Sequence, residues 1–245
     1  MSQATAQDFV EQQQRLNERR KKLHPILRRL VPLFARLDVE GLDNVPQSGP
    51  TLLMGNHISL IDPIFFTVAV QSRYVVSMAK AETLENPIQH WALKTWGNFV
   101  VNRGNVDRMA LKQAIELIRN DQLLWIAPEG TRNPQGLGEA RSGVSYIAHK
   151  SNAIIVPSAI CGAQDWAKCL MRLRRVYARV IFGQPFRLCL PEGERLSREV
   201  REQMITEAMY QLARTIPDEY AEQRGLYTDM NQATTHYLEF VRVKV

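Results

Sequence analysis

The chain has 245 residues, of which 45% are hydrophobic and 23% are charged, and its formal net charge is +6. This length suits one α/β domain, and the composition excludes a disordered or low-complexity chain. No apolar run reaches the roughly 20 residues that a membrane-spanning helix needs. An odd number of cysteines and an N-terminus without a signal-peptide pattern predict a reducing, cytoplasmic location.

Basic residues concentrate in residues 1–37, which hold eight Lys or Arg against three acids. Apolar residues at three- and four-residue spacing from Leu23 to Leu37 predict an amphipathic helix. Two interpretations are open: the helix lies on an anionic membrane surface, or it docks on the domain while its charges are solvated. Both hold if Pro25 and Pro32 divide the segment into a docked part and a lipid-facing part.

From Thr51 onward, short apolar runs alternate with helical patterns, which is typical of an α/β fold with a largely parallel central sheet flanked by helices. The predicted strands cover residues 51–55, 74–79, 98–102, 123–127, 153–160 and 176–183. The predicted helices cover residues 61–71, 86–96, 107–120, 142–150 and 196–216, with Ser197 as the cap of the last.

The expected organisation is a membrane-association segment (1–37), a single α/β domain (38–227) and a C-terminal tail (228–245) that the pattern does not place. In open α/β sheets, ligands bind beyond the carboxyl ends of the strands. Four segments follow predicted strands: NHISLID, RGN, PEGTRN and the proline-containing end of IIVPSAI. We expect them to face one cleft.

His57 and Asp62 are the first candidate pair for chemistry. Five residues on a regular helix separate two side chains by about 140°, so the pair must be joined by a loop. Asp62-Pro63 has the residue types of a helix N-cap and first turn. We expect one carboxylate oxygen of Asp62 to cap the helix and the other to orient His57 as a base for a hydroxyl. The alternative is a cap and a loop residue without chemistry.

PEGTRN is the second candidate segment, with Glu129, Gly130, Thr131 and Arg132 directly after a strand. Backbone N–H groups at a glycine turn, together with a guanidinium, suit a phosphate or another anion. Arg103 offers a second guanidinium from a neighbouring loop. The pattern predicts a phosphorylated substrate that carries a nucleophilic hydroxyl; surface ion pairing of either arginine is the alternative.

Together, these segments resemble the ordered sequence blocks of the glycerolipid acyltransferase family, which includes 1-acylglycerol-3-phosphate (lysophosphatidate) acyltransferases. Asn56, His57 and Asp62 match the first block, and GNFVVNR, with Gly97 and Arg103, resembles the second. The third block, PEGTR, is complete at 128–132, and IVPSAI, with Pro157, resembles the fourth. The chain departs at Ala127, where the family often has an aromatic residue, and at 140–141, where it often has Phe-Lys.

The resemblance implies transfer of a fatty acyl group from acyl-CoA or acyl carrier protein to the free hydroxyl of 1-acylglycerol 3-phosphate, forming phosphatidate in phospholipid biosynthesis. It implies His57 as general base and Asp62 as its orienting partner. The implied substrate-binding residues are Asn56, Arg103, Glu129, Gly130, Thr131, Arg132 and Pro157. It implies no metal, no cofactor beyond the acyl donor and no nucleic acid. The expected location is the inner face of an anionic membrane, with peripheral attachment.

Three alternatives stay open. The acceptor can be glycerol 3-phosphate, a lysophospholipid or a lyso-aminolipid; the protein can be a lipid-binding relative without catalysis; or water can replace the acceptor, giving thioester hydrolysis. The basic and apolar segment 168–175, KCLMRLRR, can meet CoA phosphates or lipid headgroups, or it can be a solvated connection.

Overall fold

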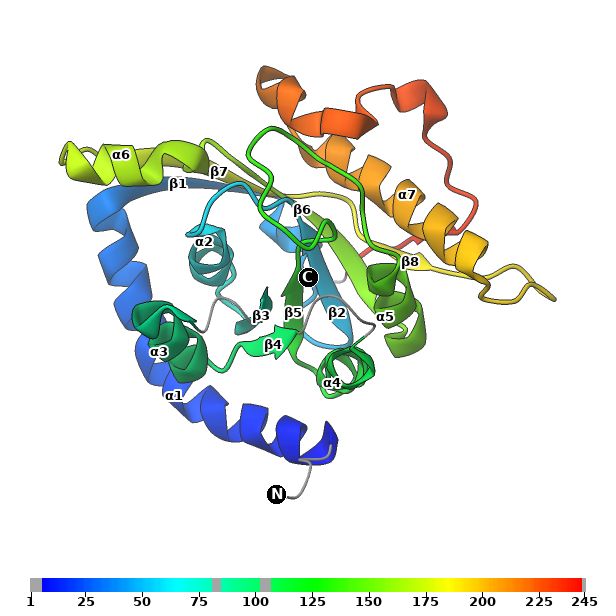
Figure 1. Cartoon of the computed structure of the whole chain (residues 1–245), viewed down its shortest axis with the longest axis horizontal. Helices are drawn as coiled ribbons and strands as arrows, with labels where there is room; N and C mark the ends of the chain where they lie inside the picture. Colours follow the sequence, from blue (N-terminus) through cyan, green and yellow to red (C-terminus); the bar gives the residue numbers. More distant parts are fainter. Residues whose placement is uncertain (1–5, 81–84, 102–106, 244–245) are drawn as a thin grey trace.

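A central β-sheet with helices on both faces forms the body of the molecule (Figure 1). The structure is a computed structural model that describes residues 6–80, 85–101 and 107–243. Its helices are α1 (Ala6–Phe34), α2 (Asp62–Ala69), α3 (Pro87–Trp96), α4 (Arg108–Arg119), α5 (Gly143–Ser151), α6 (Trp166–Met171) and α7 (Arg198–Thr215). Short 3-10 helices include η1 (Leu42–Asn44), η3 (Ala163–Asp165), η4 (Asp218–Tyr227) and η5 (Met230–Gln232).

The described strands form one sheet in the order β1-β7-β6-β2-β5-β3-β4, with β8 and β9 attached beside β6. Strands β6, β2, β5, β3 and β4 are mutually parallel, whereas β7 and β8 are antiparallel to β6. Their bounds are β1 Ala35–Glu40, β2 Thr51–Gly55, β3 Val75–Lys80, β4 Phe99–Val101, β5 Leu123–Ile126, β6 Ile154–Cys161, β7 Val176–Phe182, β8 Phe186–Leu188 and β9 Leu238–Phe240. The single α/β domain with a mostly parallel sheet is therefore confirmed.

The six predicted strands and five predicted helices are all present, with bounds that differ by at most two residues. Ser197 caps α7 as expected, because its side chain accepts a hydrogen bond from the Val200 N–H. Three strands and α6 were not predicted. Residues 35–37, expected to continue the amphipathic helix, instead begin β1, which pairs with β7. Part of the C-terminal tail forms β9 beside β8.

Two hydrophobic cores occupy the two faces of the sheet. On one face, α4, α5 and α7 cover residues such as Leu124 and Ile155, which are fully buried. On the other face, α2 covers Leu53 and Val156 and is flanked by the end of α1 near Val31. The alternation of Leu52 and Leu53 between the two cores follows from the period of two along a strand. This two-sided burial explains why the central strands are continuous apolar runs.

Helix α1 is continuous through Pro25 and Pro32, and it docks on the domain through polar as well as apolar side chains. Arg20 is fully buried, and its Nε–H donates to the carbonyl oxygen of Trp96 at 2.7 Å. Gln13 donates from Nε2 to the Gly97 carbonyl at 2.8 Å and accepts from Arg20. Burial lowers the pKa of Arg20 to about 10. Because α1 is continuous from Ala6 to Phe34, Pro25 and Pro32 do not divide it into two segments.

Gly97 allows this docking. Its φ of +86° lies in the region that favours glycine, and a Cβ there would lie 2.4 Å from Leu16 Cδ1 and 2.7 Å from Arg20 Nη2. The glycine noted in the sequence therefore lets α1 approach the end of α3 closely.

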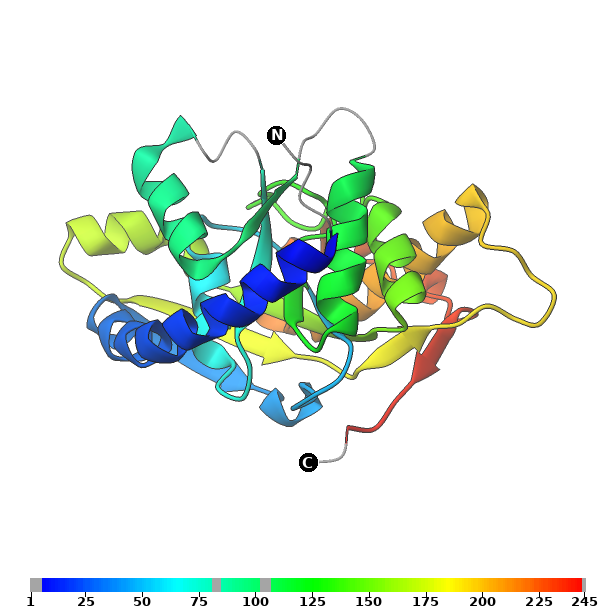
Figure 2. The same cartoon turned by 90° about the horizontal axis from the view of Figure 1, so that it is seen from below.

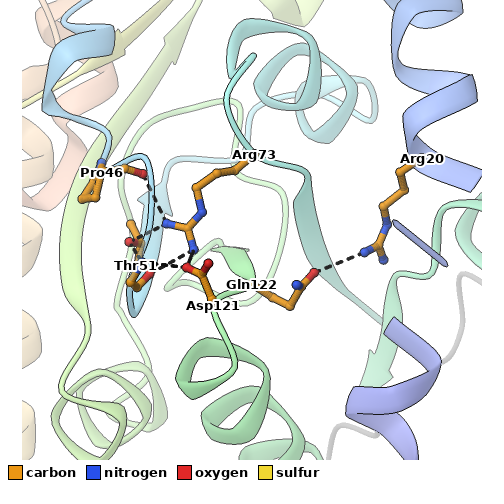
Figure 3. Close-up of polar contacts among 7 residues, drawn as sticks. Arg20, Pro46, Thr51, Arg73, Asp121 and Gln122 are labelled. Atoms are coloured by element: carbon orange, nitrogen blue, oxygen red, sulfur yellow. Dashed lines mark hydrogen bonds and ion pairs between the residues drawn. The ribbon is translucent and has the colours of Figure 1, made fainter. Parts of the chain in front are cut away.

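Arg73 holds together the loops at the amino ends of the central strands (Figure 3). Its guanidinium donates to Thr51 Oγ1 at 2.8 Å, to the Gly49 carbonyl at 2.9 Å and to Asp121 Oδ1 at 3.0 Å. A cavity of about 350 Å³ opens beside it, towards Lys21 and His24 of α1. It lies at the opposite edge of the sheet from His57, so it is not the expected substrate cleft.

Among the described helices, none combines the length and the apolar character that crossing a membrane requires.

Candidate active site

His57 and Asp62 lie at the carboxyl end of β2, where residues 56–61 form a loop that leads into α2. The Nδ1 atom of His57 is 2.9 Å from Asp62 Oδ2. The Asp62 side chain is fully buried, whereas the His57 side chain keeps 20% of its surface exposed. The structure therefore brings the predicted pair together, with the aspartate beneath and the imidazole open to solvent.

The expectation that Asp62 caps α2 is wrong. Ile61 is the N-cap residue and Asp62 is the first residue of the helix, with Pro63 following it. The Asp62 carboxylate instead points back into the loop, where Oδ2 accepts from the N–H groups of Ile58 and Ser59, both at 2.7 Å. Oδ1 accepts from the Ser59 hydroxyl at 2.5 Å. The loop itself thus replaces the water that this buried carboxylate has lost.

This arrangement fixes the tautomer of His57. A carboxylate that already receives three other hydrogen bonds is an acceptor, so the Nδ1–H group of His57 must be the donor in the contact with Asp62. The Nε2 atom is then left with its lone pair. The Trp125 ring lies edge to face with the imidazole, at 5.5 Å between centroids, and supports it from β5. Ser59 and Trp125 thus contact the candidate pair directly, although the sequence pattern did not single them out.

Asn56 and Pro157 are buried rather than open to a substrate. The Asn56 amide donates to the Ile160 carbonyl at 2.8 Å and accepts from the Ile160 N–H at 2.7 Å, so it ties the end of β2 to β6. Pro157 lies within β6 opposite Met54 of β2. Asn56 thus ties the His57 loop to β6, and Pro157 belongs to the sheet; the substrate-binding roles that the sequence suggested for them stay predictions.

The PEGTRN loop follows β5 and contacts the His57 loop directly. The Asn133 N–H donates to the His57 carbonyl at 2.7 Å, and the Asn133 amide donates to Glu129 Oε1 at 3.2 Å. Glu129 also accepts from the Gly138 N–H at 2.7 Å. Asn133 follows PEGTR immediately in the sequence, but nothing in the sequence indicated that it would bridge the two loops.

Glu129 is a buried carboxylate close to His57. Burial raises its pKa above the ordinary value, and the two donors and the charge of protonated His57 oppose that shift. Gly130, with φ +69°, makes the turn that follows it. Glu129 thus faces the centre of the site, and it shapes the loop from within.

Thr131 and Arg132 are exposed beyond that turn. Arg132 forms no ion pair with any residue that the structure describes, so its guanidinium is available to an anion. Arg103, the second predicted guanidinium, lies outside the described residues. The structure therefore shows one of the two predicted arginines exposed in the loop that contacts the His57 loop.

Comparison with known families decides the class of this site. The family model described as "Acyltransferase" matches residues 36–161, which include the His57 and PEGTRN loops. The chain belongs to the acyltransferase family. His57, Asp62, Arg103 and Arg132 all lie within the matched region, so the match covers the candidate site as well as the scaffold. An acyltransferase of this family takes an acyl donor and a lipid acceptor as substrates.

Individual relatives of this acyltransferase carry more specific names. It is 31% identical over 134 residues to the 1-acyl-sn-glycerol-3-phosphate acyltransferase of Borreliella burgdorferi, and 29% identical over 154 residues to the chloroplastic enzyme LPAT1 of Arabidopsis thaliana. These matches cover 54% and 58% of this chain, and only 53% and 42% of the relatives. The chain thus spans about half the length of these relatives.

Two other matches extend further. The 1-acyl-sn-glycerol-3-phosphate acyltransferase of Bacillus subtilis is 27% identical over 76% of this chain and 90% of its own length. The crystal structure of the 1-acyl-sn-glycerophosphate acyltransferase PlsC from Thermotoga maritima superposes with a TM-score of 0.56, at 24% identity and with 77% of each chain covered. The structural match shows a shared fold.

Proposed function

We propose that the protein transfers a fatty acyl group from a thioester, acyl-CoA or acyl carrier protein, to the free hydroxyl of 1-acylglycerol 3-phosphate, forming phosphatidate for phospholipid biosynthesis. The observation that carries the proposal is the His57 and Asp62 pair, with the buried aspartate orienting a partly exposed imidazole, close to an exposed arginine in a chain of the acyltransferase family. Relatives named for this activity support the choice of acceptor.

In the proposed reaction, Nε2 of His57 takes the proton of the acceptor hydroxyl as its oxygen attacks the thioester carbonyl carbon. The tetrahedral intermediate then expels the thiolate, and the imidazolium returns the proton to that sulfur. General-base assistance of this kind is worth roughly 10²–10⁴ in rate. Positioning of the two substrates and stabilisation of the oxyanion must supply the remainder.

Asp62 would hold the imidazole in the reactive tautomer and stabilise the imidazolium that forms, without itself moving a proton. Arg132, with Arg103, would bind the acceptor phosphate, because a guanidinium matches two phosphate oxygens at once. Glu129, Gly130 and Thr131 would shape the acceptor site between these groups. The Asn133 N–H keeps this loop in register with His57.

We also propose peripheral attachment to an anionic membrane, at its cytoplasmic face, through the C-terminal half of α1. Val31 of this half is buried, whereas Ile26, Leu30 and Leu33 are exposed along one stripe. The two interpretations of the amphipathic helix thus apply to different faces of one helix. Deleting residues 1–37 would expose the buried face and remove part of β1, so exposed positions must be substituted instead.

An acceptor panel tests the proposal. Purified protein with labelled acyl-CoA is offered 1-acylglycerol 3-phosphate, glycerol 3-phosphate, a lysophosphatidylcholine and no acceptor. We expect labelled phosphatidate with the first acceptor at a rate well above the others. Faster transfer to another acceptor would show that the preferred acceptor is not 1-acylglycerol 3-phosphate. Release of free CoA at the same rate with and without an acceptor would indicate a thioesterase.

A further inference from the structure

The end of α6 and the residues that follow it (residues 170–175, the α6 loop) present apolar side chains that nothing in the described structure covers. Leu173 is 95% exposed, Met171 is 78% exposed and Leu170 is 47% exposed. Leu173 also has a φ of +53°, a conformation in which glycine or asparagine is ordinarily found. A leucine in this place contributes no packing to the fold, so its apolar surface requires another explanation.

The same loop is strongly basic. Arg172, Arg174 and Arg175 are exposed, and residues 166–178 contain no acidic residue. Lys168 is paired with Asp165 at 2.8 Å, whereas no ion pair joins the three arginines to any described carboxylate. Apolar side chains between unpaired arginines are complementary to a surface with anionic groups at its rim and hydrocarbon beneath.

This loop meets the end of α1 at one corner of the molecule. Ala35, where α1 passes into β1, pairs with Val176, where the loop passes into β7. Nη1 of Arg175 donates to the Pro32 carbonyl at 3.5 Å. Both views show the loop after α6 running towards this end of α1 (Figures 1 and 2). The exposed residues Ile26, Leu30, Leu33, Leu170, Met171 and Leu173 lie on the two segments that meet at this corner, and we call them the corner patch.

The corner patch lies towards the catalytic edge of the sheet. Helix α6 follows β6, which is parallel to β2 with Ser158 opposite Gly55, so both strands end on the side of His57. Leu60 and Ile64, next to Asp62, are also exposed on this side. Figure 1 shows α2, which carries Ile64 and directly follows the loop with Leu60, between α6 and α3. A lipid surface against the corner would lie close to the opening at His57.

We infer that the α6 loop is a lipid-binding element that seats the protein on an anionic membrane together with the exposed stripe of α1. Leu170, Met171 and Leu173 enter the hydrocarbon boundary, and Arg172, Arg174 and Arg175 bind anionic headgroups. This inference deepens the proposed function and rests on it for the lipid substrate. Membrane binding itself is measured separately from acyl transfer.

Vesicle sedimentation of the full chain tests the inference. The vesicles contain phosphatidylcholine with about one third phosphatidylglycerol, a composition that supplies the negative surface potential. The variants are M171S/L173N, R172Q/R174Q and, for the α1 stripe, L30S/L33S. Asparagine is chosen at 173 because it tolerates the left-handed backbone. The matched controls are L226N, an exposed leucine in η4, and R195Q/R198Q, two exposed arginines far from the corner along the chain.

We expect each corner variant to need at least about 5-fold more lipid for half-maximal binding. The double arginine change should have a larger effect, because each basic residue near the surface accounts for roughly a 5-fold change in binding. Both controls should bind like the unchanged protein. Unchanged circular dichroism and melting temperature would show that the variants fold. Corner variants that sediment like the controls would overturn the inference.

A second measurement separates this inference from the proposed reaction. Acyl transfer is followed with a short-chain acceptor that stays monomeric in water, so no lipid surface is involved. The corner variants should keep this activity and lose activity on vesicle-bound acceptor. If the unchanged protein shows no transfer but the corner variants still lose vesicle binding, the proposed function fails and the inference stands. Normal vesicle binding with selective loss of activity on a carrier-protein donor would replace the membrane by an acidic protein partner.

Discussion

The Asp62 carboxylate organises the loop that carries His57. It is fully buried and accepts hydrogen bonds from His57, from two loop N–H groups and from the Ser59 hydroxyl. The same contacts that fold residues 57–61 around the carboxylate also orient the imidazole. Structure and chemistry at this position therefore depend on the same atoms, and a change to one of the donors should affect both.

Ser59→Ala is predicted to lower both the stability and the activity of the protein, because it removes the only donor to Asp62 Oδ1 among the described residues. Loss of a hydrogen bond to a charged group costs about 1.5–3 kcal/mol. We expect a lower free energy of unfolding and a lower kcat, with little change in the KM for the acceptor. Steady-state kinetics and chemical denaturation measure both quantities. A lowered stability with unchanged kcat would show that Asp62 orients His57 without help from Ser59.

Glu129→Gln is predicted to change how stability depends on pH. Burial raises the pKa of Glu129, so the folded chain binds this proton more tightly than the unfolded chain does. The contribution of this group is therefore fully present below the ordinary glutamate pKa of about 4.3 and is lost as the pH rises through the raised pKa. The melting temperature of Glu129→Gln, relative to the unchanged protein, should rise between about pH 4 and pH 7. A difference in melting temperature that stays the same at every pH would contradict this prediction.

At the scale of elements, α1 is part of the domain through contacts that its sequence pattern hides. The apolar stripe was the visible signal, but much of the docking uses Gln13, Arg20 and His24, which are buried. The His24 ring lies 2.9 Å from the Thr67 carbonyl of α2, and Arg20 reaches the end of α3. These contacts leave the outer stripe of the helix free to meet another surface.

Gly97→Ala is predicted to loosen this docking. The new methyl group would lie 2.4 Å from Leu16 and 2.7 Å from Arg20 at a backbone φ of +86°, so both sterics and backbone strain oppose it. We expect a loss of about 2–4 kcal/mol in the free energy of unfolding, measured by denaturant titration. Gly193→Ala is the matched control, because φ is +82° there and a Cβ would meet nothing within 4 Å. Equal losses in the free energy of unfolding for Gly97→Ala and Gly193→Ala would show that α1 shifts to make room for the methyl group without a measurable energetic cost.

The sequence predicts the parallel core well because each central strand is a short apolar run followed by a turn or helix signal. It fails at the edges for physical reasons. Strand β1 alternates charged and apolar residues and continues a helix without a break, and β8 and β9 have three residues each, so no period can be recognised. In the site, the His57 and Asp62 pair was predicted, but Asp62 was wrongly assigned as a cap because Asp-Pro is typical of helix starts.

At the scale of the whole molecule, the parallel strands bring distant segments to one edge. Residues 56–62 and 127–138 follow β2 and β5, which are neighbours in the sheet, and Asn133 bonds to the His57 carbonyl across the gap. Helix α6 emerges from β6 on the same side. His57, the exposed Arg132 and the basic apolar corner thus share one edge, an arrangement that would suit the proposed acyl transfer to a lipid acceptor.

The central claim is that His57 is the base for acyl transfer to 1-acylglycerol 3-phosphate. The most direct test measures labelled phosphatidate formed from labelled acyl-CoA and this acceptor by the purified protein and by His57→Ala, with His149→Ala as a folding-matched control on α5. We predict that His57→Ala lowers kcat by roughly 10²-fold or more, while the control keeps its rate. Equal rates of phosphatidate formation by His57→Ala and the unchanged protein would contradict the account.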